Sequence, residues 1–440
     1  MSLLEHPKAR ALLEDATVTA GSVRGCRSQM TRFLQRYLPL FYREEQRENA
    51  GIVIAGRLSG LERKTSEPIA YQAGLQRKPI QNFVGAGAWD DEAVSAEMRR
   101  HVAEKLGEPN GVLVLDPSAF PKKGTESCGV QRQWCGRLGK IENCQVGVFL
   151  AYASSAGHAP LDRRLYLPKS WAEDGQRRKK CHVPQAVRFQ HKWQIGLDLI
   201  CRSAALPHRW VVADDEFGRV SPFRAKLRAM QELYVLDVPC NTWMRDLEEE
   251  LPRRRSRYGP GRKQPLMRVD RWAQGQAPER WQTFAVRAAE KGPLRVQALS
   301  RRVQTRDPNR RTGPEERLIV IRTIEAQPKV YYALSNALTE PLAELVRVHG
   351  ERHRIEEMFA EGNGEVGLDH YEVRSWVGWH HHMTLSLLAL WFLVLQKRRV
   401  GEKITSDHGG ANSGDLQSAA ATPASERRTN RRRGHSRAAA

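Results

Sequence analysis

The sequence predicts an α/β fold in which helices flank a mixed β-sheet. Two short apolar segments, 111–115 and 210–213, have the length and branched side chains of buried strands, and each runs into an aspartate, Asp116 and Asp214. Further strand-like segments are found at 143–152, 164–167 and 233–238. Stretches with helical periodicity lie before, between and after these strands, which is typical of a layered α/β protein.

Residues 1–105 are predicted to form a helical, DNA-binding region. Large apolar side chains recur at helical spacing through 30–42, and the segment 66–84 has Pro68 near a helix start and a glycine between two short helices. This pattern resembles a helix-turn-helix, with Arg77 and Lys78 at the start of the second helix as candidate DNA contacts. An ordinary helical pair packed on the core is the alternative.

Residues 106–239 are predicted to be the first part of the catalytic core. Their expected order is three strands, a helix (183–206), a strand, a helix and a strand, which matches a ribonuclease H-like mixed sheet. A β-rich insertion is expected at 240–335, and the C-terminal helices of the core at 336–400. The tail, 401–440, has almost no large apolar residues and is expected to be disordered.

Composition indicates a nucleic-acid partner. The chain of 440 residues has a formal net charge of +21 together with 11 Trp and 11 Phe, so a basic surface accompanies a real core. The longest apolar run, 383–395, is too short to cross a membrane and is expected to be a buried helix. Seven irregularly spaced cysteines indicate reduced thiols in a cytoplasmic protein.

Three acids are the candidate catalytic and metal-binding residues. Asp116 and Asp214 follow predicted strands, and Glu356 lies in a segment predicted to be helical. Carboxylates of this kind can hold two Mg²⁺ ions, which Mn²⁺ can replace, for phosphodiester cleavage and strand transfer. Asp116 would bridge both ions, with Asp214 on one and Glu356 on the other. Taken singly, each acid could instead cap a turn or form a surface ion pair.

Several neighbours compete for these roles or could assist them. Side chains alternate across a strand, so only one of Asp214, Asp215 and Glu216 is expected to face the metals, and Asp214 is chosen because it closes the apolar run. Glu357 lies about 100° around the helix from Glu356 and is expected to point elsewhere. Asp237 and Asp369 are weaker candidates. The cations considered for DNA binding beside the acids are Arg352, Lys122 and Lys123. The two lysines either contact DNA or belong to a solvated loop.

From Asp116 to 395 the chain resembles the DDE-type insertion-sequence transposases, in the group of DDE superfamily endonucleases with a β-strand insertion domain. The segments that carry this resemblance are 120–124, 129–136, 143–147, 160–168, 211–214 and 367–376. The resemblance implies that Asp116, Asp214 and Glu356 are the metal-binding triad. It also implies that Arg352 contacts phosphate and that the helical N-terminal part binds element ends.

The resemblance implies a bacterial, cytoplasmic, nucleoid-associated transposase. Its partners would be double-stranded DNA, as terminal repeats and target, and a second copy of the chain in the DNA complex. Two positions depart from the family pattern, because His349 and Asn363 stand where relatives carry Tyr and Lys. A nuclease without strand transfer and an inactive, DNA-binding repressor therefore remain alternatives.

Overall fold

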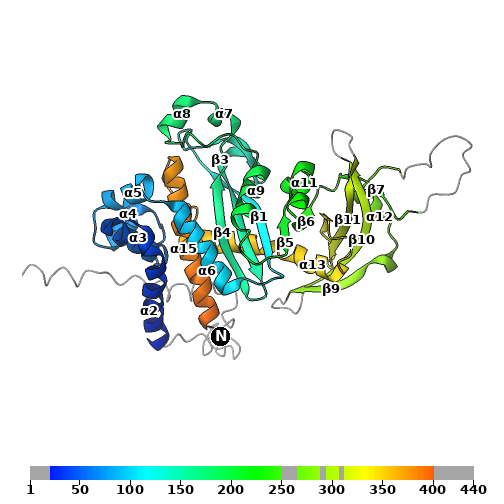
Figure 1. Cartoon of the computed structure of the whole chain (residues 1–440), viewed down its shortest axis with the longest axis horizontal. Helices are drawn as coiled ribbons and strands as arrows, with labels where there is room; N and C mark the ends of the chain where they lie inside the picture. Colours follow the sequence, from blue (N-terminus) through cyan, green and yellow to red (C-terminus); the bar gives the residue numbers. More distant parts are fainter. Residues whose placement is uncertain (1–19, 250–264, 288–293, 307–311, 401–440) are drawn as a thin grey trace, which may run out of the picture.

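The computed structural model describes residues 20–249, 265–287, 294–306 and 312–400 (Figure 1). Residues 250–264 of the expected insertion and the tail 401–440 lie outside these ranges. In the described residues one mixed sheet of twelve strands runs through the molecule, in the order β2-β3-β1-β5-β6-β12-β11-β10-β7-β8. Strand β4 pairs with β3, and β9 pairs with β10. The fold is therefore α/β with a mixed sheet and flanking helices, as the sequence predicts.

The first half of the sheet centres on β1. Its strands are β1 (Val112–Pro121), β2 (Gln131–Cys135), β3 (Lys140–Ser154), β4 (Gly157–Leu165), β5 (Trp210–Ala213) and β6 (Leu233–Asp237). Strand β1 pairs antiparallel with β3 and parallel with β5, and β5 pairs parallel with β6. The apolar residues 112–115 of β1 are fully buried, which explains their continuous run of branched side chains.

Three element boundaries differ from the sequence-based expectation. Strand β1 continues past Asp116 to Pro121, because β3 still pairs with it after the shorter β5 has ended. Strand β4 ends at Leu165, so the expected strand at 164–167 is mostly its C-terminal end. The helix expected at 183–206 is only α9 (Lys192–Arg202), because the residues around Pro184 form turns.

Helices cover both faces of this half. They are α6 (Asp91–Leu106), α7 (Lys169–Ala172), α8 (Gly175–Lys180), α9, α10 (Asp215–Gly218), α11 (Ser221–Ala229), α13 (Leu342–Gly350), α14 (His353–Val366) and α15 (Trp376–Val400). Helix α15 is the apolar helix expected at 383–395, and its side chains from Met383 to Leu393 are all buried. No helix among the described residues is both long and apolar enough to span a bilayer.

The N-terminal helices pack on α15 and α6 (Figure 1, blue). They are α2 (Ala20–Tyr37), the 3-10 turn η2 (Leu38–Leu40), α3 (Glu44–Arg57), α4 (Ser66–Gln72) and α5 (Arg77–Ala86). Gly74 joins α4 to α5 with a φ of 69°, a left-handed conformation that glycine adopts without strain. Thr65 is the N-cap position of α4. Asp90 caps α6, where its side chain accepts from the N–H groups of Glu92 and Ala93.

The second half of the sheet is formed by strands between residues 243 and 335. It contains β7 (Trp243–Asp246), β8 (Met267–Arg268), β9 (Gln282–Arg287), β10 (Leu294–Arg306), β11 (Thr312–Thr323) and β12 (Val330–Ser335), with helix α12 (Val269–Gln274) and the 3-10 turn η4 (Pro278–Arg280). These elements share a hydrophobic cluster of their own around Met244, Trp272 and Leu318. Strand β12 nevertheless pairs with β6, so both halves belong to one continuous sheet.

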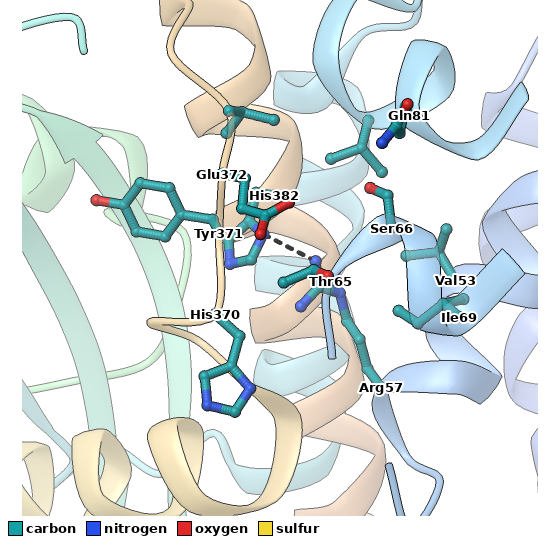
Figure 2. A pocket seen from close by; sticks show the side chains of 12 residues that line it. Val53, Arg57, Thr65, Ser66, Ile69, Gln81, His370, Tyr371, Glu372 and His382 are labelled. Carbon is teal, nitrogen blue, oxygen red and sulfur yellow. Dashed lines mark hydrogen bonds between the residues drawn. The ribbon is translucent and has the colours of Figure 1, made fainter. Parts of the chain in front are cut away.

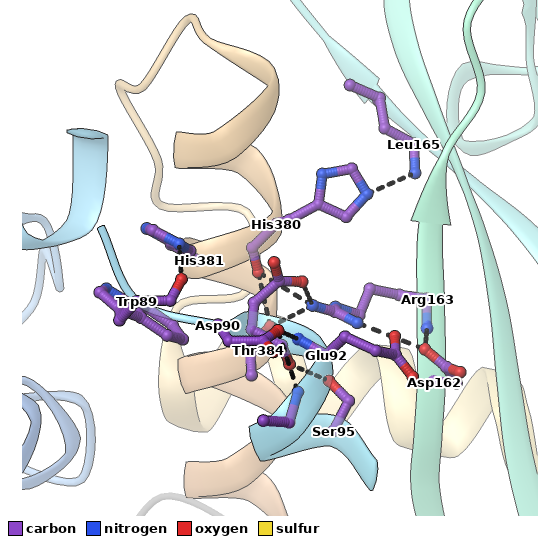
Figure 3. Close-up of polar contacts among 12 residues, drawn as sticks. Trp89, Asp90, Glu92, Ser95, Asp162, Arg163, Leu165, His380, His381 and Thr384 are labelled. Carbon is purple, nitrogen blue, oxygen red and sulfur yellow. Dashed lines mark hydrogen bonds and ion pairs between the residues drawn. The ribbon is translucent and has the colours of Figure 1, made fainter. Parts of the chain in front are cut away.

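A buried ionic network ties α6 and α15 to β4 (Figure 3). Arg163 of β4 is 2 % exposed and contacts Asp162, Asp91 and the hydroxyl of Thr384. Asp162 is fully buried and also accepts from Arg99, at 2.8 Å. Buried charges of this kind are tolerated only when they are paired, so the network fixes how these three elements pack.

Candidate active site

The register of the sheet brings Asp116 and Asp214 side by side. Leu115 of β1 is paired in parallel with Ala213, the last residue of β5, and each aspartate is the residue that follows in the chain. The two aspartates therefore lie side by side at the point where β5 ends. Asp214 also begins α10, where its carboxylate accepts from the N–H of Glu216 at 3.0 Å. That bond orients the Asp214 side chain.

Alternation along β1 directs Asp116 toward α14. Leu115 packs beneath α9 on one face, since a Cβ on Gly196 would lie only 2.5 Å from it. Asp116 therefore belongs to the opposite face, with its cross-strand neighbour Phe149. The ring of Phe149 meets the ring of Phe359 on α14 edge to face, with centroids 5.1 Å apart. Glu356 lies one helical turn before Phe359 and so faces the same space.

One cavity of about 390 Å³ is lined by all three predicted acids, Asp116, Asp214 and Glu356. Arg352 and Asn363 line it as well. Asp215 and Glu357 do not: Asp215 pairs with Arg219 at 2.6 Å, and Glu357 pairs with Arg354 at 2.9 Å. The expectation that these two neighbours point elsewhere agrees with the structure. Glu216, in contrast, also lines the cavity and pairs with Lys192 at 2.7 Å.

Burial and neighbouring carboxylates raise the pKa of Asp116 and of Asp214. Burial, followed by the negative charge of Asp214, raises the pKa of Asp116 well above its usual value, although Arg352 opposes this. Burial and then Glu216 raise the pKa of Asp214 to about 6. Carboxylate oxygens are the donors that hard divalent cations prefer. The residues present therefore fit a Mg²⁺ or Mn²⁺ site.

Within the described residues, no three His, Cys, Asp or Glu side chains converge closely enough to hold a single ion. Glu356 is paired instead with Arg352 at 3.2 Å and with the His353 ring at 3.1 Å. The predicted two-ion arrangement needs fewer protein ligands at each ion. Each ion would take two protein carboxylates and complete its shell with water and phosphate. A rotation of Glu356 toward Asp116 would supply the second pair.

Arg352 is held among the acids. Its Nε lies 3.1 Å from Asp237 Oδ2, and His349 bonds the other oxygen of Asp237 at 2.9 Å. Burial opposes ionisation of Asp237, but the charges of His349 and Arg352 outweigh it and lower its pKa. Asp237, considered a weaker catalytic candidate, is thus a partner of Arg352 and does not line the cavity.

The other predicted DNA contacts lie apart from the cavity. Arg77 and Lys78 are exposed at the start of α5, with Arg77 3.2 Å from Glu67. Lys123 is exposed, whereas Lys122 donates to the Tyr371 carbonyl at 3.3 Å and lies 3.5 Å above the Tyr371 ring. Burial lowers the pKa of Lys122 to about 8. Lys122 therefore has a structural contact that the sequence did not indicate.

Sequence reasoning missed the hairpin that forms one wall of the cavity. Trp134 of β2 lines the cavity with its side chain 59 % exposed, and Arg137 lines it from the 3-10 turn η3 (Gly136–Leu138). Arg137 is oriented by Asp369 at 2.7 Å. The sequence signal for this hairpin is Trp134 followed by Gly136 and Gly139, because glycines between two strand-like segments are typical of a hairpin turn.

A charge-removing variant tests the electrostatics of the cavity. The pKa of Asp214 is raised from 3.8 to about 6, so the folded state holds a proton that the unfolded state has lost between these values. The carboxylate therefore destabilises the fold as pH rises through this window, and fully so above it. With EDTA present, Asp214→Asn is expected to melt at a higher temperature than the wild type above pH ~6 and at a similar temperature near pH ~4.

Asp215→Asn is the matched control, since its carboxylate faces Arg219 outside the cavity. Mg²⁺ is expected to raise the melting temperature of the wild type and of Asp215→Asn, but to do little for Asp214→Asn. Equal Mg²⁺ responses in all three proteins would contradict a metal site at Asp214.

Comparison with known proteins identifies the family. Residues 36–308 match the DDE superfamily endonuclease family, a span that includes Asp116 and Asp214 and stops before Glu356. Over 230 residues the chain is 25 % identical to a probable transposase for insertion sequence element IS701 from Microchaete diplosiphon. That alignment covers 51 % of this chain and 57 % of the relative's length. The family match covers more than half of the chain, which therefore belongs to the DDE superfamily endonucleases.

Proposed function

We propose that this endonuclease is a transposase that cleaves the ends of an insertion sequence and joins them to target DNA. The single observation that carries the proposal is the cavity beside the middle of β1 and the carboxyl end of β5, lined by Asp116, Asp214 and Glu356. The name of the similar protein from Microchaete diplosiphon supports the same substrate. The strand order β4-β3-β1-β5-β6 supports a ribonuclease H-like core. The helical region would precede this core in the chain, and the β-rich region would be an insertion into it.

Two divalent ions, when bound, would lower the pKa of an attacking water and stabilise the charge on the leaving oxygen. Asp116 would contact both, Asp214 one and Glu356 the other. In the first reaction water adds to the scissile phosphorus and the P–O3′ bond breaks, which leaves a 3′-hydroxyl and a 5′-phosphate. In the second, that hydroxyl loses its proton and attacks a target phosphate, whose own 3′-oxygen leaves. The number of phosphodiester bonds is unchanged in this second reaction.

The chain's own residues would position the DNA. Arg352 lies against the acids and carries a positive charge where a bridging phosphate would arrive. Its pKa is raised, because the charges of Asp237, Asp116, Glu356 and Asp214 outweigh the effect of burial. Trp134 presents an exposed indole beside the same cavity and could stack on a base or sugar of the strand being cut.

The deciding experiment supplies the purified protein with Mg²⁺, a labelled element end and a supercoiled target plasmid. Labelled 3′ ends covalently joined to the plasmid are the expected product. Cleaved ends without joined product would favour a nuclease. DNA binding without cleavage in Mg²⁺ or Mn²⁺ would favour a repressor. This outcome is worth testing because Asn363 lines the cavity at a position where the family pattern has Lys. The experiment also reports whether two ends are held together, as a dimer would require.

The helical region is proposed to bind the element ends through phosphate contacts. A plot of log affinity against log salt concentration is expected to be steep, since each neutralised phosphate contributes about −0.9 to the slope. Arg77→Ala and Lys78→Ala should each make the slope shallower by about 1. Lys226→Ala, which removes an exposed lysine of α11, serves as the control and should leave the slope unchanged. Equal slopes in all four proteins would move the DNA-binding surface away from α5.

A further inference from the structure

A second cavity, of about 190 Å³, lies between the N-terminal helices and the segment that leads into α15 (Figure 2). Helices α3, α4 and α5 and residues 370–373 form its walls, and it shares no lining residue with the cavity of the three acids. Its polar lining includes Arg57, Thr65, Ser66, Gln81, His370 and His382. It is a distinct site by position and by chemistry.

Arg57 is the central feature of this cavity. It is only 2 % exposed, and its guanidinium donates to the Val366 carbonyl at 3.2 Å and to His382 Nδ1 at 3.0 Å. Its Nε–H has no acceptor among the described residues. No carboxylate forms an ion pair with Arg57 in the part of the chain that the structure describes. Buried arginines are ordinarily paired with a carboxylate. Arg57 differs from them because no described carboxylate supplies that counter-charge.

The surrounding groups do not neutralise Arg57. His382 accepts from it through Nδ1 and contacts the Leu368 carbonyl through Nε2 at 3.0 Å, which assigns a neutral ring with the proton on Nε2. Burial, and then the charge of Arg57, hold the pKa of His382 well below its usual value. Glu372 also lines the cavity, but its carboxylate is 62 % exposed and lies 3.7 Å from Arg63.

Burial without a counter-charge lowers the pKa of Arg57 to about 9. Lys64 is also 2 % exposed. Burial lowers the pKa of Lys64 to about 8; the charge of Glu365 opposes this shift and the charge of Arg57 adds to it. Two buried cations thus repel one another beside the cavity. An anion that enters it would be attracted by both charges.

We propose that this cavity binds a phosphate-type oxyanion, held by the Arg57 guanidinium. The unpartnered Nε–H and the second hydrogen of a terminal nitrogen lie on one edge of the planar guanidinium, and that edge matches two oxygens of such a group. The hydroxyls of Thr65 and Ser66 and the amide of Gln81 are further donors on the same cavity. Free inorganic phosphate and a phosphate of a DNA strand share this chemistry. The site does not depend on the proposed cleavage reaction, because anion binding can be measured without DNA or metal.

The first test titrates inorganic phosphate into the full chain, without DNA or metal, by isothermal calorimetry at constant ionic strength. Saturable binding is expected, together with a higher melting temperature in phosphate than in chloride. Thr65→Val and Gln81→Leu keep Arg57 and are each expected to weaken phosphate binding by about tenfold, one hydrogen bond to a charged group. The neighbouring exposed residue on α5 supplies the control, Asn82→Leu, which should bind phosphate like the wild type.

Arg57→Lys keeps a charge but loses the fork, and is expected to bind phosphate more weakly than the wild type. A purely structural Arg57, which only ties α3 to the end of α14, predicts lower stability in this variant and no phosphate response in the wild type. Absence of saturable phosphate binding, or binding unchanged by Thr65→Val and Gln81→Leu, overturns the proposal.

A competition arm identifies the source of the anion. A short single-stranded oligonucleotide that displaces phosphate from the wild type would assign the site to a DNA phosphate, and comparison of 5′-phosphorylated with 5′-hydroxyl ends would show whether a strand terminus is required. Failure to displace phosphate would assign the site to a free oxyanion. Failure of the proposed transposase activity would leave this measurement unaffected, so the two proposals can be tested separately.

Discussion

Asp214→Asn is expected to abolish Mg²⁺-dependent DNA cleavage while leaving DNA binding nearly intact. The substitution removes one carboxylate from the shared cavity but keeps the side-chain oxygen that accepts from the Glu216 N–H. The cleavage rate should fall by about 10³-fold or more, roughly 4 kcal/mol of transition-state stabilisation. Single-turnover cleavage of a labelled element end measures the rate, and a binding assay in Ca²⁺ or EDTA measures affinity.

The chain offers matched controls at two of the three positions. Asp215→Asn changes the adjacent acid, which pairs with Arg219, and Glu357→Gln changes the residue after Glu356, which pairs with Arg354. Both controls are expected to cleave at near wild-type rates, whereas Asp214→Asn and Glu356→Gln are not. Full activity in Asp214→Asn, or equal losses in Asp214→Asn and Asp215→Asn, would remove Asp214 from the proposed triad.

Three residues of the cavity, Asp116, Asp214 and Glu356, could be predicted from local patterns in the sequence. Asp116 and Asp214 follow short apolar runs, and those runs are adjacent, buried, parallel strands in the structure. Glu356 lies in a helix, α14, as its periodicity indicated. These local patterns carry the information because buried strands and amphipathic helices have short periods that a single chain displays.

Contacts that depend on distant pairings could not be predicted in the same way. Trp134 reaches the cavity because β2 pairs with β3, and Lys122 is held by Tyr371, nearly 250 residues away in sequence. The continuity of the sheet is another example, since β12 joins β6 after an intervening β-rich segment. Neither β propensity nor spacing specifies which strands pair, because pairing is decided by the packing of the whole sheet.

Positively charged side chains show the same difference between what local sequence indicates and what contacts with distant parts of the chain decide. Arg352 and Lys122 were both considered as DNA contacts from their positions in the sequence. Arg352 lines the cavity of the three acids, whereas Lys122 is half-buried on an aromatic ring. Arg57, which had no signal in the sequence, is almost fully buried and has no ion pair with any carboxylate that the structure describes. A basic composition therefore predicts the class of partner, but burial and pairing decide which individual cations are available to it.

Asp162→Asn is expected to produce a large loss of stability. Asp162 is fully buried on β4 and lies between three arginines: Arg99 at 2.8 Å, Arg163 at 3.3 Å and Arg202 at 3.5 Å (Figure 3 shows Arg163 beside it). Removing its charge leaves the buried Arg163 and Arg99 with too little compensation. Such a change destabilises a protein by roughly 3–5 kcal/mol. Urea unfolding followed by tryptophan fluorescence measures the shift of the midpoint.

Asp198→Asn is the matched control for this prediction. Its carboxylate is 44 % exposed and lies 3.3 Å from Arg164, so it is an ion pair of similar composition in a solvated place. Exposed pairs contribute roughly 0–1 kcal/mol, because water screens the charges and the side chains must be ordered. A small shift for Asp198→Asn beside a large one for Asp162→Asn would identify burial as the cause. Comparable shifts would mean that the Asp162 network does not hold α6 and α15 against the sheet.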